Sequence, residues 1–220
     1  QAKRLEQIIF ADFLHPQAKK LCERLTRITK LDRVFFSDNG STAVEVALKI
    51  AYQYWQNTGE EKYQIIAFEG AYHGDTFGAM ALGERNIFNA SFERLMFPVK
   101  RVEWPSTWIN DEQIDKKEEV AINHLIELLQ TPTSAVILEP IIQGAGGMNM
   151  VRPEFVKKVY EVVKQNNSLL IADEVLTGFG RCGSLFAFQK ANIEPDIISL
   201  SKGLTGGFLP MGVTLSKEEI

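Results

Sequence analysis

The sequence contains few cysteines and no cysteine motif. Among 220 residues there are only Cys22 and Cys182, which lie far apart and form no Cys-x-x-Cys arrangement. Small secreted domains that depend on disulfides have many paired cysteines, and structural zinc sites have closely spaced ones, so both classes are disfavoured. Two scattered thiols suit a reducing compartment, and we therefore expect a cytoplasmic protein.

Long apolar runs and basic clusters are missing as well. No stretch approaches the roughly 18 consecutive apolar residues of a membrane span. The net charge is −4 at pH 7, and no basic run carries interleaved aromatic residues. These features give no reason to expect nucleic acid or a membrane as a partner. We expect no metal site either, because His73 has no second histidine at metal-binding spacing.

The two ends of the sequence lead us to expect a fragment. The chain begins Gln-Ala-Lys-Arg, with neither an initiator methionine nor a signal-peptide pattern. It stops at Ile220, shortly after a predicted strand. The length suffices for one large domain or two small ones. We predict that residues 1–220 form one large domain that binds a cofactor.

Short apolar runs alternate with helical patterns along the chain. The predicted strands are residues 34–36, 65–68, 135–138, 169–172, 197–200 and 213–215. The predicted helices lie within 1–30 (with a break at His15-Pro16), at 43–55, at 120–130, from Pro153 to 163, and near 184–191. Residues 76–118 are expected to form loops and short elements, with the charged run 115–119 as a solvated helix start. This alternation predicts an α/β fold with a parallel or mixed sheet and helices on both faces.

An acid and an amine follow two of the predicted strands. Asp173 comes directly after 169–172, and Lys202 follows 197–200. In open α/β sheets, ligands bind beyond the carboxyl ends of the strands, so these two side chains can meet the same ligand. Taken singly, Asp173 could cap a turn and Lys202 could be a solvent-facing lysine. Their joint placement predicts a clamp for one ligand.

A candidate phosphate site precedes the buried helix at 43–55. Free backbone N–H groups at a helix N-terminus attract an anion, and Gly40 lets the backbone come close to it. The hydroxyls of Ser41 and Thr42 could add donors. The alternative is an ordinary helix cap, and Thr42 and Glu45 have the spacing of a capping box. A phosphate cradle, a carboxylate and an amine together suit pyridoxal phosphate, which forms a Schiff base with lysine and whose ring nitrogen needs an acidic partner.

A second motif leaves another class of function open. Residues 178–183 match Gly-x-Gly-x-x-Gly and follow a predicted strand, which is typical of dinucleotide-binding sites. However, five residues separate the strand from Gly178, and no long apolar helix opens at Gly183. A nicotinamide-dependent oxidoreductase is therefore the less favoured hypothesis.

Four separated motifs resemble the class III aminotransferases, a family of pyridoxal-phosphate enzymes of fold type I. The motifs are Tyr72-His-Gly74, Glu139-Pro140 with Gln143-Gly, Asp173 to Arg181, and Ser201-Lys-Gly203. They occur in the order found in the family and extend over nearly the whole chain. The resemblance implies the large domain of that fold, without the N-terminal segment and the C-terminal small domain. It also implies a homodimer with a shared active site.

The resemblance assigns roles to individual residues. Lys202 would form the Schiff base, Asp173 would pair with the pyridine nitrogen, and Tyr72 would stack on the ring as the third catalytic residue. The implied cofactor contacts are Gly40, Ser41, Thr42, Tyr72, His73, Gln143, Asp173 and Lys202. The implied substrate contacts are Tyr72, Asp75 and Arg181, and Glu139 would be a substrate-side or structural polar group.

Within the family, the finer match is to members that act in biotin synthesis. It is carried by residues 53–56, 72–80, 142–148 and 204–207. This match implies transfer of an amino group from S-adenosylmethionine, or from lysine, to 8-amino-7-oxononanoate, giving 7,8-diaminononanoate by a ping-pong mechanism. The alternatives are a class III aminotransferase that acts on an ω-amino acid or diamine, and a catalytically silent fragment.

Overall fold

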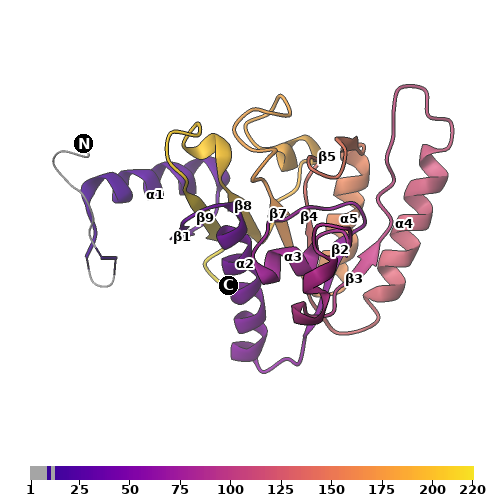
Figure 1. The fold of residues 1–220 in the computed structure, drawn as a ribbon, viewed down its shortest axis with the longest axis horizontal. Coiled ribbons are helices and arrows are strands. Elements are labelled where there is room, and N and C mark those ends of the chain that lie inside the picture. Colours follow the sequence, from indigo (N-terminus) through magenta and orange to yellow (C-terminus); the bar gives the residue numbers. More distant parts are fainter. Residues whose placement is uncertain (1–8, 11–12) are drawn as a thin grey trace.

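The computed structural model describes residues 9–10 and 13–220, and a seven-stranded sheet forms its centre (Figure 1). The strand order is β1-β9-β8-β7-β4-β2-β3. The strands are β1 (Arg33–Ser37), β2 (Gln64–Phe68), β3 (Lys100–Val102), β4 (Thr133–Leu138), β7 (Leu169–Asp173), β8 (Ile197–Leu200) and β9 (Gly212–Ser216). Strand β9 is antiparallel to both of its neighbours, whereas β3, β2, β4, β7 and β8 are parallel. The predicted, mostly parallel sheet is confirmed.

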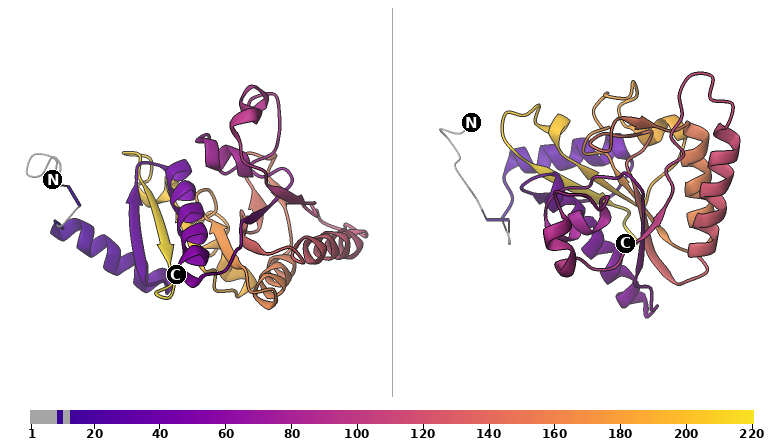
Figure 2. Two further views of the ribbon diagram at one scale, coloured as in Figure 1. Left: turned by 90° about the horizontal axis from the view of Figure 1, so that it is seen from below. Right: turned by 45° about the vertical axis from the view of Figure 1, so that its right-hand side comes forward.

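Helices cover both faces of this sheet, as predicted (Figures 1 and 2). The α-helices are α1 (Pro16–Thr29), α2 (Gly40–Thr58), α3 (Phe77–Leu82), α4 (Ile114–Leu128) and α5 (Pro153–Gln165). Three short 3₁₀-helices are η1 (Ala90–Leu95), η2 (Ala187–Ala191) and η3 (Lys202–Leu204), and β5 (Ile142–Gln143) pairs with β6 (Asn149–Met150) in a separate hairpin. Helices α2 and α3 pack on one face, and α1, α4 and α5 contribute to the core on the other.

Helix α2 begins earlier than its apolar pattern indicates. Its buried residues recur at helical spacing from Ala43 to Trp55, but the helix starts at Gly40 with Asn39 as its N-cap. The Asn39 side chain accepts a hydrogen bond from the Thr42 N–H at 3.0 Å, and the Thr42 hydroxyl accepts one from the Asn39 N–H at 2.9 Å. The capping box predicted for Thr42 and Glu45 is therefore wrong, because Asn39 occupies the cap and Thr42 takes the reciprocal position.

The predictions for the other helices agree with the structure to different degrees. The charged run 115–119 lies in the first turns of α4, as predicted, and Pro153 is the first residue of α5. The segment near 184–191 forms only the 3₁₀-helix η2. Helix α1 starts at Pro16, and the part of that prediction that concerns residues 1–8 and 11–12 lies outside the described residues. Within the described part of the chain, no helix combines the length and apolar character needed to cross a bilayer.

Candidate active site

A pocket of about 290 Å³ opens at the carboxyl ends of the parallel strands. Its walls come from the first turn of α2 and from the loops after β2, β4, β7 and β8. The lining residues are Asn39, Gly40, Ser41, Tyr72, His73, Gly74, Glu139, Ala145, Asp173, Val175, Leu176, Ser201 and Lys202. Asp173 is the last residue of β7, and Lys202 lies two residues after the end of β8. The structure thus brings together the acid and the amine that the strand pattern singled out.

Asp173 is held by a buried histidine. Its Oδ2 lies 2.6 Å from Nδ1 of His73, and the exposed fractions of the two side chains are 3% and 0%. The other carboxylate oxygen, Oδ1, accepts the N–H of Val175 at 3.0 Å. Because an ionised carboxylate only accepts hydrogen bonds, His73 donates through Nδ1 and orients Asp173. Among the described residues, Nε2 of His73 is buried without a hydrogen-bond partner.

The first turn of α2 supplies free donors to the same pocket. Within the described residues, the N–H groups of Gly40 and Ser41 have no acceptor. The Ser41 hydroxyl oxygen accepts the N–H of Asp75 at 3.1 Å, which leaves its own proton available for donation. A Cβ atom at Gly40 would lie 2.7 Å from Cγ1 of Val175, so no larger residue fits there without displacement. These donors at a helix N-terminus form a cradle for an anion, which we call the anion cradle (Gly40 and Ser41).

Thr42 has a different place from the one expected. Its hydroxyl accepts from the Asn39 N–H and donates to the Asn39 carbonyl, both at 2.9 Å. Both hydroxyl functions are therefore used within the cap of α2, and Thr42 is not among the residues that line the pocket. The predicted contact between Thr42 and a phosphate stays a prediction that this geometry does not favour.

Lys202 combines an available amine with a rare backbone conformation. Its φ angle is 33°, in the left-handed region that side-chain-bearing residues seldom adopt. Its Nζ makes no hydrogen bond or ion pair with any described residue, and the side chain is exposed at the pocket. Strained backbone of this kind persists only where the surrounding structure holds it, and it clusters at ligand sites. The result is an uncommitted amine at the pocket that Asp173 also lines.

Tyr72 and Glu139 form another wall of the pocket. The buried carboxylate of Glu139 accepts the N–H of Tyr72 at 3.1 Å and the N–H of Gly144 at 3.0 Å. Burial raises the pKa of Glu139; nearby His73 counteracts part of this effect, and Asp173 adds to it. The Tyr72 hydroxyl donates to Asp75 at 2.9 Å, and burial together with this hydrogen bond raises the pKa of Tyr72 to about 12. Tyr72 is therefore a neutral donor at physiological pH.

Three predicted site residues lie away from this pocket. Gln143 is buried, and its Nε2 donates to the carbonyl of Glu69 at 2.8 Å. Arg181 is exposed, and its Nε donates to the carbonyl of Leu176 at 2.8 Å. Asp75 lines a second hollow of about 510 Å³, which shares Tyr72 with the first. Contacts of Gln143 with a cofactor and of Asp75 and Arg181 with a substrate stay predictions.

Glu174 is a buried carboxylate whose role is not apparent from the sequence. It accepts the Thr177 hydroxyl at 2.7 Å and the N–H groups of Ala187 and Phe188 at 3.0 and 2.8 Å. Burial raises its pKa to about 7, against the favourable effect of these donors. The sequence shows that Glu174 follows Asp173. The local pattern does not indicate that the N–H donors for its carboxylate lie 13 and 14 residues further along the chain.

The same loop decides against the dinucleotide reading of residues 178–183. These glycines belong to a turn that Glu174 ties to the start of η2. The helix that follows is a five-residue 3₁₀-helix, whereas a dinucleotide site places the pyrophosphate at the N-terminus of a long helix. The motif therefore lacks the helix that its function would require.

Comparisons with known proteins agree on one family. The family Aminotransferase class-III matches residues 1–220. The adenosylmethionine-8-amino-7-oxononanoate aminotransferase of Synechococcus elongatus is 56% identical over 223 residues, covering 100% of this chain and 53% of that protein. The enzyme of the same name from Geobacter sulfurreducens is 40% identical and is covered to 51%. The chain thus spans about half the length of the curated relatives it matches.

Solved structures show the same fold. An amine transaminase from an uncultivated Pseudomonas species, in its PLP-bound form, superimposes with a TM-score of 0.91 at 32% identity, covering 100% of this chain and 52% of that one. The adenosylmethionine-8-amino-7-oxononanoate aminotransferase of Methanocaldococcus jannaschii gives a TM-score of 0.85 at 33% identity, covering 99% of this chain and 50% of that one.

Proposed function

The chain belongs to the class-III aminotransferases, and from this premise we propose that the full-length protein is an aminotransferase that depends on pyridoxal phosphate. The observation that carries the proposal is the meeting of three groups in one pocket: the uncommitted amine of Lys202, the Asp173–His73 pair and the anion cradle. No two of these groups are neighbours in sequence, so a purely local role does not explain why they converge.

The residues of the pocket fit this cofactor. The anion cradle would hold the phosphate, since its N–H groups and the Ser41 hydroxyl are available donors. Asp173 would face the pyridine nitrogen, Tyr72 would border the ring, and Lys202 would bond to the aldehyde carbon. When bound, the cofactor supplies a carbonyl carbon for the amino group and a ring that withdraws electrons from the reacting carbon.

Each protein group then has a definite task. Asp173, oriented by His73, would pair with the ring nitrogen and favour its protonated form, because a buried carboxylate favours a positive partner. The Lys202 amine would be the base that takes a proton from the carbon of the amino donor and the acid that returns it. Tyr72, neutral because its pKa is raised to about 12, can donate a hydrogen bond without changing charge.

For the substrates, we infer an amino donor that is S-adenosylmethionine and an acceptor that is 8-amino-7-oxononanoate. Support comes from the names of relatives that match the whole chain, the S. elongatus protein at 56% identity among them. Lysine is the alternative donor. A class III aminotransferase acting on an ω-amino acid or diamine is the second candidate, because an amine transaminase shares the fold at a TM-score of 0.91. We also infer a cytoplasmic homodimer with a shared active site.

The decisive experiment uses the full-length protein. A near-visible absorbance band that borohydride abolishes is expected for a cofactor bound to lysine, and a purified protein without such a band would contradict the cofactor assignment. Turnover is then measured with 8-amino-7-oxononanoate against S-adenosylmethionine and lysine. A protein that ignores this ketone and accepts 4-aminobutyrate or ornithine would instead support the second candidate.

The 220-residue segment provides a second test of the proposal. Large apolar side chains are exposed on it, including Phe35, Ile87, Phe88 and Phe208. Apolar surface of this kind is typical of faces that pack against other protein. The isolated segment is expected to associate and to be weakly active at best, whereas the full-length protein is expected to be a dimer by light scattering. Steady turnover by a monomer of the segment would contradict this expectation.

A further inference from the structure

Two side chains of α2 hold the segment that follows β2 by accepting hydrogen bonds from its backbone. Ser41 and Glu45 lie four residues apart and therefore on the same face of the helix. The Ser41 hydroxyl accepts the N–H of Asp75 at 3.1 Å. Oε1 of Glu45 accepts the N–H groups of Gly78 and Ala79 at 2.7 and 3.2 Å. One helix thus contacts both the turn at Asp75 and the beginning of α3.

Glu45 caps the N-terminus of α3 in place of that helix's own N-cap residue. The N-cap residue of α3 is Thr76, and its side chain makes no capping hydrogen bond. Gly78 and Ala79 are the second and third residues of that helix, so their N–H groups have no acceptor within it. The carboxylate of Glu45 satisfies both and places a negative charge at the positive end of the helix dipole.

Glycine at two positions permits this approach. A Cβ atom at Gly78 would lie 2.8 Å from Cδ of Glu45, and one at Gly74 would lie 2.6 Å from Cβ of Ser41. Both distances are shorter than real Cβ contacts, so a side chain at either position would push the α2 side chain away. The glycines of the segment 72–80 therefore leave room for the side chains of Ser41 and Glu45.

The segment held by Ser41 and Glu45 follows directly on one wall of the pocket, which Tyr72, His73 and Gly74 form. Tyr72 lines the pocket and donates its hydroxyl proton to Asp75, whose own N–H is held by Ser41. The same first turn of α2 provides the anion cradle. We propose that Glu45 is a positioning residue that, through α3 and Asp75, holds the wall formed by Tyr72, His73 and Gly74 at a set position relative to the anion cradle. Its kinetic consequences rest on the proposed function, whereas its structural consequences do not.

The first test compares variants of the full-length holoenzyme. Glu45→Ala removes the acceptor, Glu45→Gln keeps an oxygen that can accept both N–H groups, and Glu154→Ala is the matched control. Glu154 is an exposed carboxylate in the first turn of α5 and does not line the pocket. Hydrogen–deuterium exchange of the α3 amides should be faster by about tenfold in Glu45→Ala, because their acceptor is gone. It should be near wild type in Glu45→Gln and in Glu154→Ala.

Kinetics separate positioning from simple loss of stability. In Glu45→Ala, KM for the amino donor should rise by about tenfold while kcat stays within about threefold, because the displaced wall binds substrate in the ground and transition states alike. A lower melting temperature with an unchanged KM would mean that Glu45 is only structural, and would overturn the proposal. Glu45→Gln behaving like Glu45→Ala would overturn the hydrogen-bonding role.

A second variant approaches the same contact from the other side. Gly78→Ala adds a methyl group within a helix, where alanine is intrinsically favoured over glycine. In the wild-type background it should displace Glu45 and raise KM as Glu45→Ala does. In the Glu45→Ala background it should have no effect or stabilise the protein. A harmless Gly78→Ala, or one equally harmful in both backgrounds, would overturn the proposal.

The outcomes for the two proposals are distinguishable. Exchange of the α3 amides is measurable with or without cofactor, so unchanged exchange in Glu45→Ala speaks against the role of Glu45 alone. A wild-type protein that binds no pyridoxal phosphate would speak against the proposed function, even if the exchange rates change as expected.

Discussion

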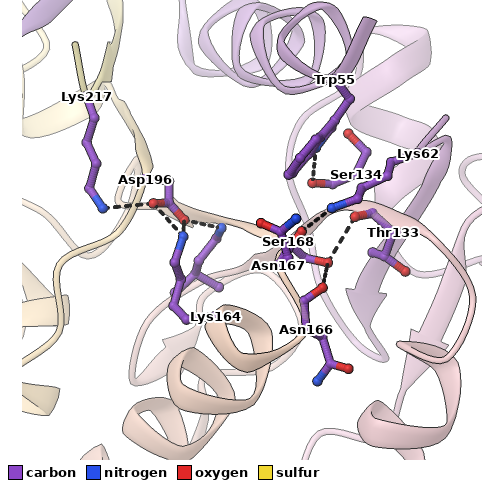
Figure 3. Close-up of polar contacts among 11 residues, drawn as sticks. Trp55, Lys62, Thr133, Ser134, Lys164, Asn166, Asn167, Ser168, Asp196 and Lys217 are labelled. Atoms are coloured by element: carbon purple, nitrogen blue, oxygen red, sulfur yellow. Dashed lines mark hydrogen bonds and ion pairs between the residues drawn. The ribbon is translucent and has the colours of Figure 1, made fainter. Parts of the chain in front are cut away.

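An aspartate is buried at each end of the parallel strands, which we call the amino edge and the carboxyl edge of the sheet. The two aspartates differ in how many hydrogen-bond partners they have. At the amino edge, Asp196 accepts from Lys164 at 2.8 and 2.9 Å, from Lys217 at 2.8 Å and from the N–H of Leu170 at 2.8 Å (Figure 3). At the carboxyl edge, Asp173 has one histidine and one N–H, and the amine of Lys202 is uncommitted. At the amino edge, Asp196 has several hydrogen-bond donors. At the carboxyl edge, the Lys202 amine and Nε2 of His73 have no partner among the described residues.

The surroundings of the two aspartates repeat this difference. At the amino ends of β4 and β7, the Trp55 indole donates to the Ser134 carbonyl, the Lys62 amine donates to the Asn167 carbonyl, and the Ser168 hydroxyl donates to the Thr133 carbonyl (Figure 3). The buried Ser134 hydroxyl is an exception, since it has no partner among the described residues. Saturated groups of this kind stabilise the fold, and unsaturated ones cost stability unless a ligand pairs with them. The same chemistry thus serves stability at the amino edge and, in the proposed function, cofactor binding at the carboxyl edge.

The largest effect is expected for Lys202→Ala in the full-length protein. Loss of the amine that we propose as the cofactor's attachment point and as the base should lower turnover by about 10³-fold or more. The melting temperature of the cofactor-free protein should stay close to wild type, because the Lys202 side chain is exposed and unpaired. Lys190→Ala, which removes another exposed lysine, is the control. Peptide mapping after borohydride reduction should find the cofactor on Lys202, and a label on any other lysine would refute the assignment.

The next effect separates the two edges directly. Asp173→Asn should lower turnover by about 10²-fold or more, since the cofactor's ring nitrogen would lose the anionic partner that we propose for it. Asp196→Asn should leave turnover per folded molecule unchanged but lower the free energy of unfolding by about 2–4 kcal/mol, because two lysines lose their anion. Urea unfolding and steady-state kinetics on both variants give the comparison. A large stability loss for Asp173→Asn with normal turnover would reverse the roles assigned to the two edges.

The pH dependence of stability should depend on Glu174. The folded-state pKa, raised by burial to about 7, lies above the ordinary value of 4.5, so the folded state binds the proton more tightly than the unfolded chain. The resulting stabilisation is present below about pH 4.5 and is lost as the pH rises through about 7. Between pH 5 and 8 the free energy of unfolding should fall by about 2–3 kcal/mol because of Glu174, and Glu174→Gln should abolish this fall. Equal slopes for wild type and variant in urea titrations would contradict it.

The smallest effect concerns one hydrogen bond of the amino edge. The buried Ser168 hydroxyl donates to the Thr133 carbonyl at 2.9 Å and so connects the start of β7 with β4. Ser168→Ala should lower the free energy of unfolding by about 1 kcal/mol, the usual net value of such a bond. Turnover should not change. A kinetic defect in this variant would show that the two edges are coupled.

Predicting the carboxyl edge from sequence succeeded where the signal was local. Four apolar residues followed by Asp173, and a second apolar run followed by Ser201 and Lys202, are sufficient to indicate buried strands with polar groups at their ends. Parallel strands carry such ends to one edge of the sheet, so the meeting of Asp173 and Lys202 follows from the strand pattern. The apolar pattern predicts the start of α2 three residues too late, because it carries no information about the helix cap.

The sequence by itself determined the order of strands and helices along the chain, the burial of the parallel strands and the chemical character of the groups at their ends. Only the tertiary structure decided which group pairs with which. His73 meets Asp173 across 100 positions of sequence, and Glu45 meets Gly78 across 33. Local patterns report burial and propensity over a few residues, whereas such pairings depend on how whole helices and loops pack against the sheet. Packing therefore left Asp196 saturated and the amine of Lys202 free.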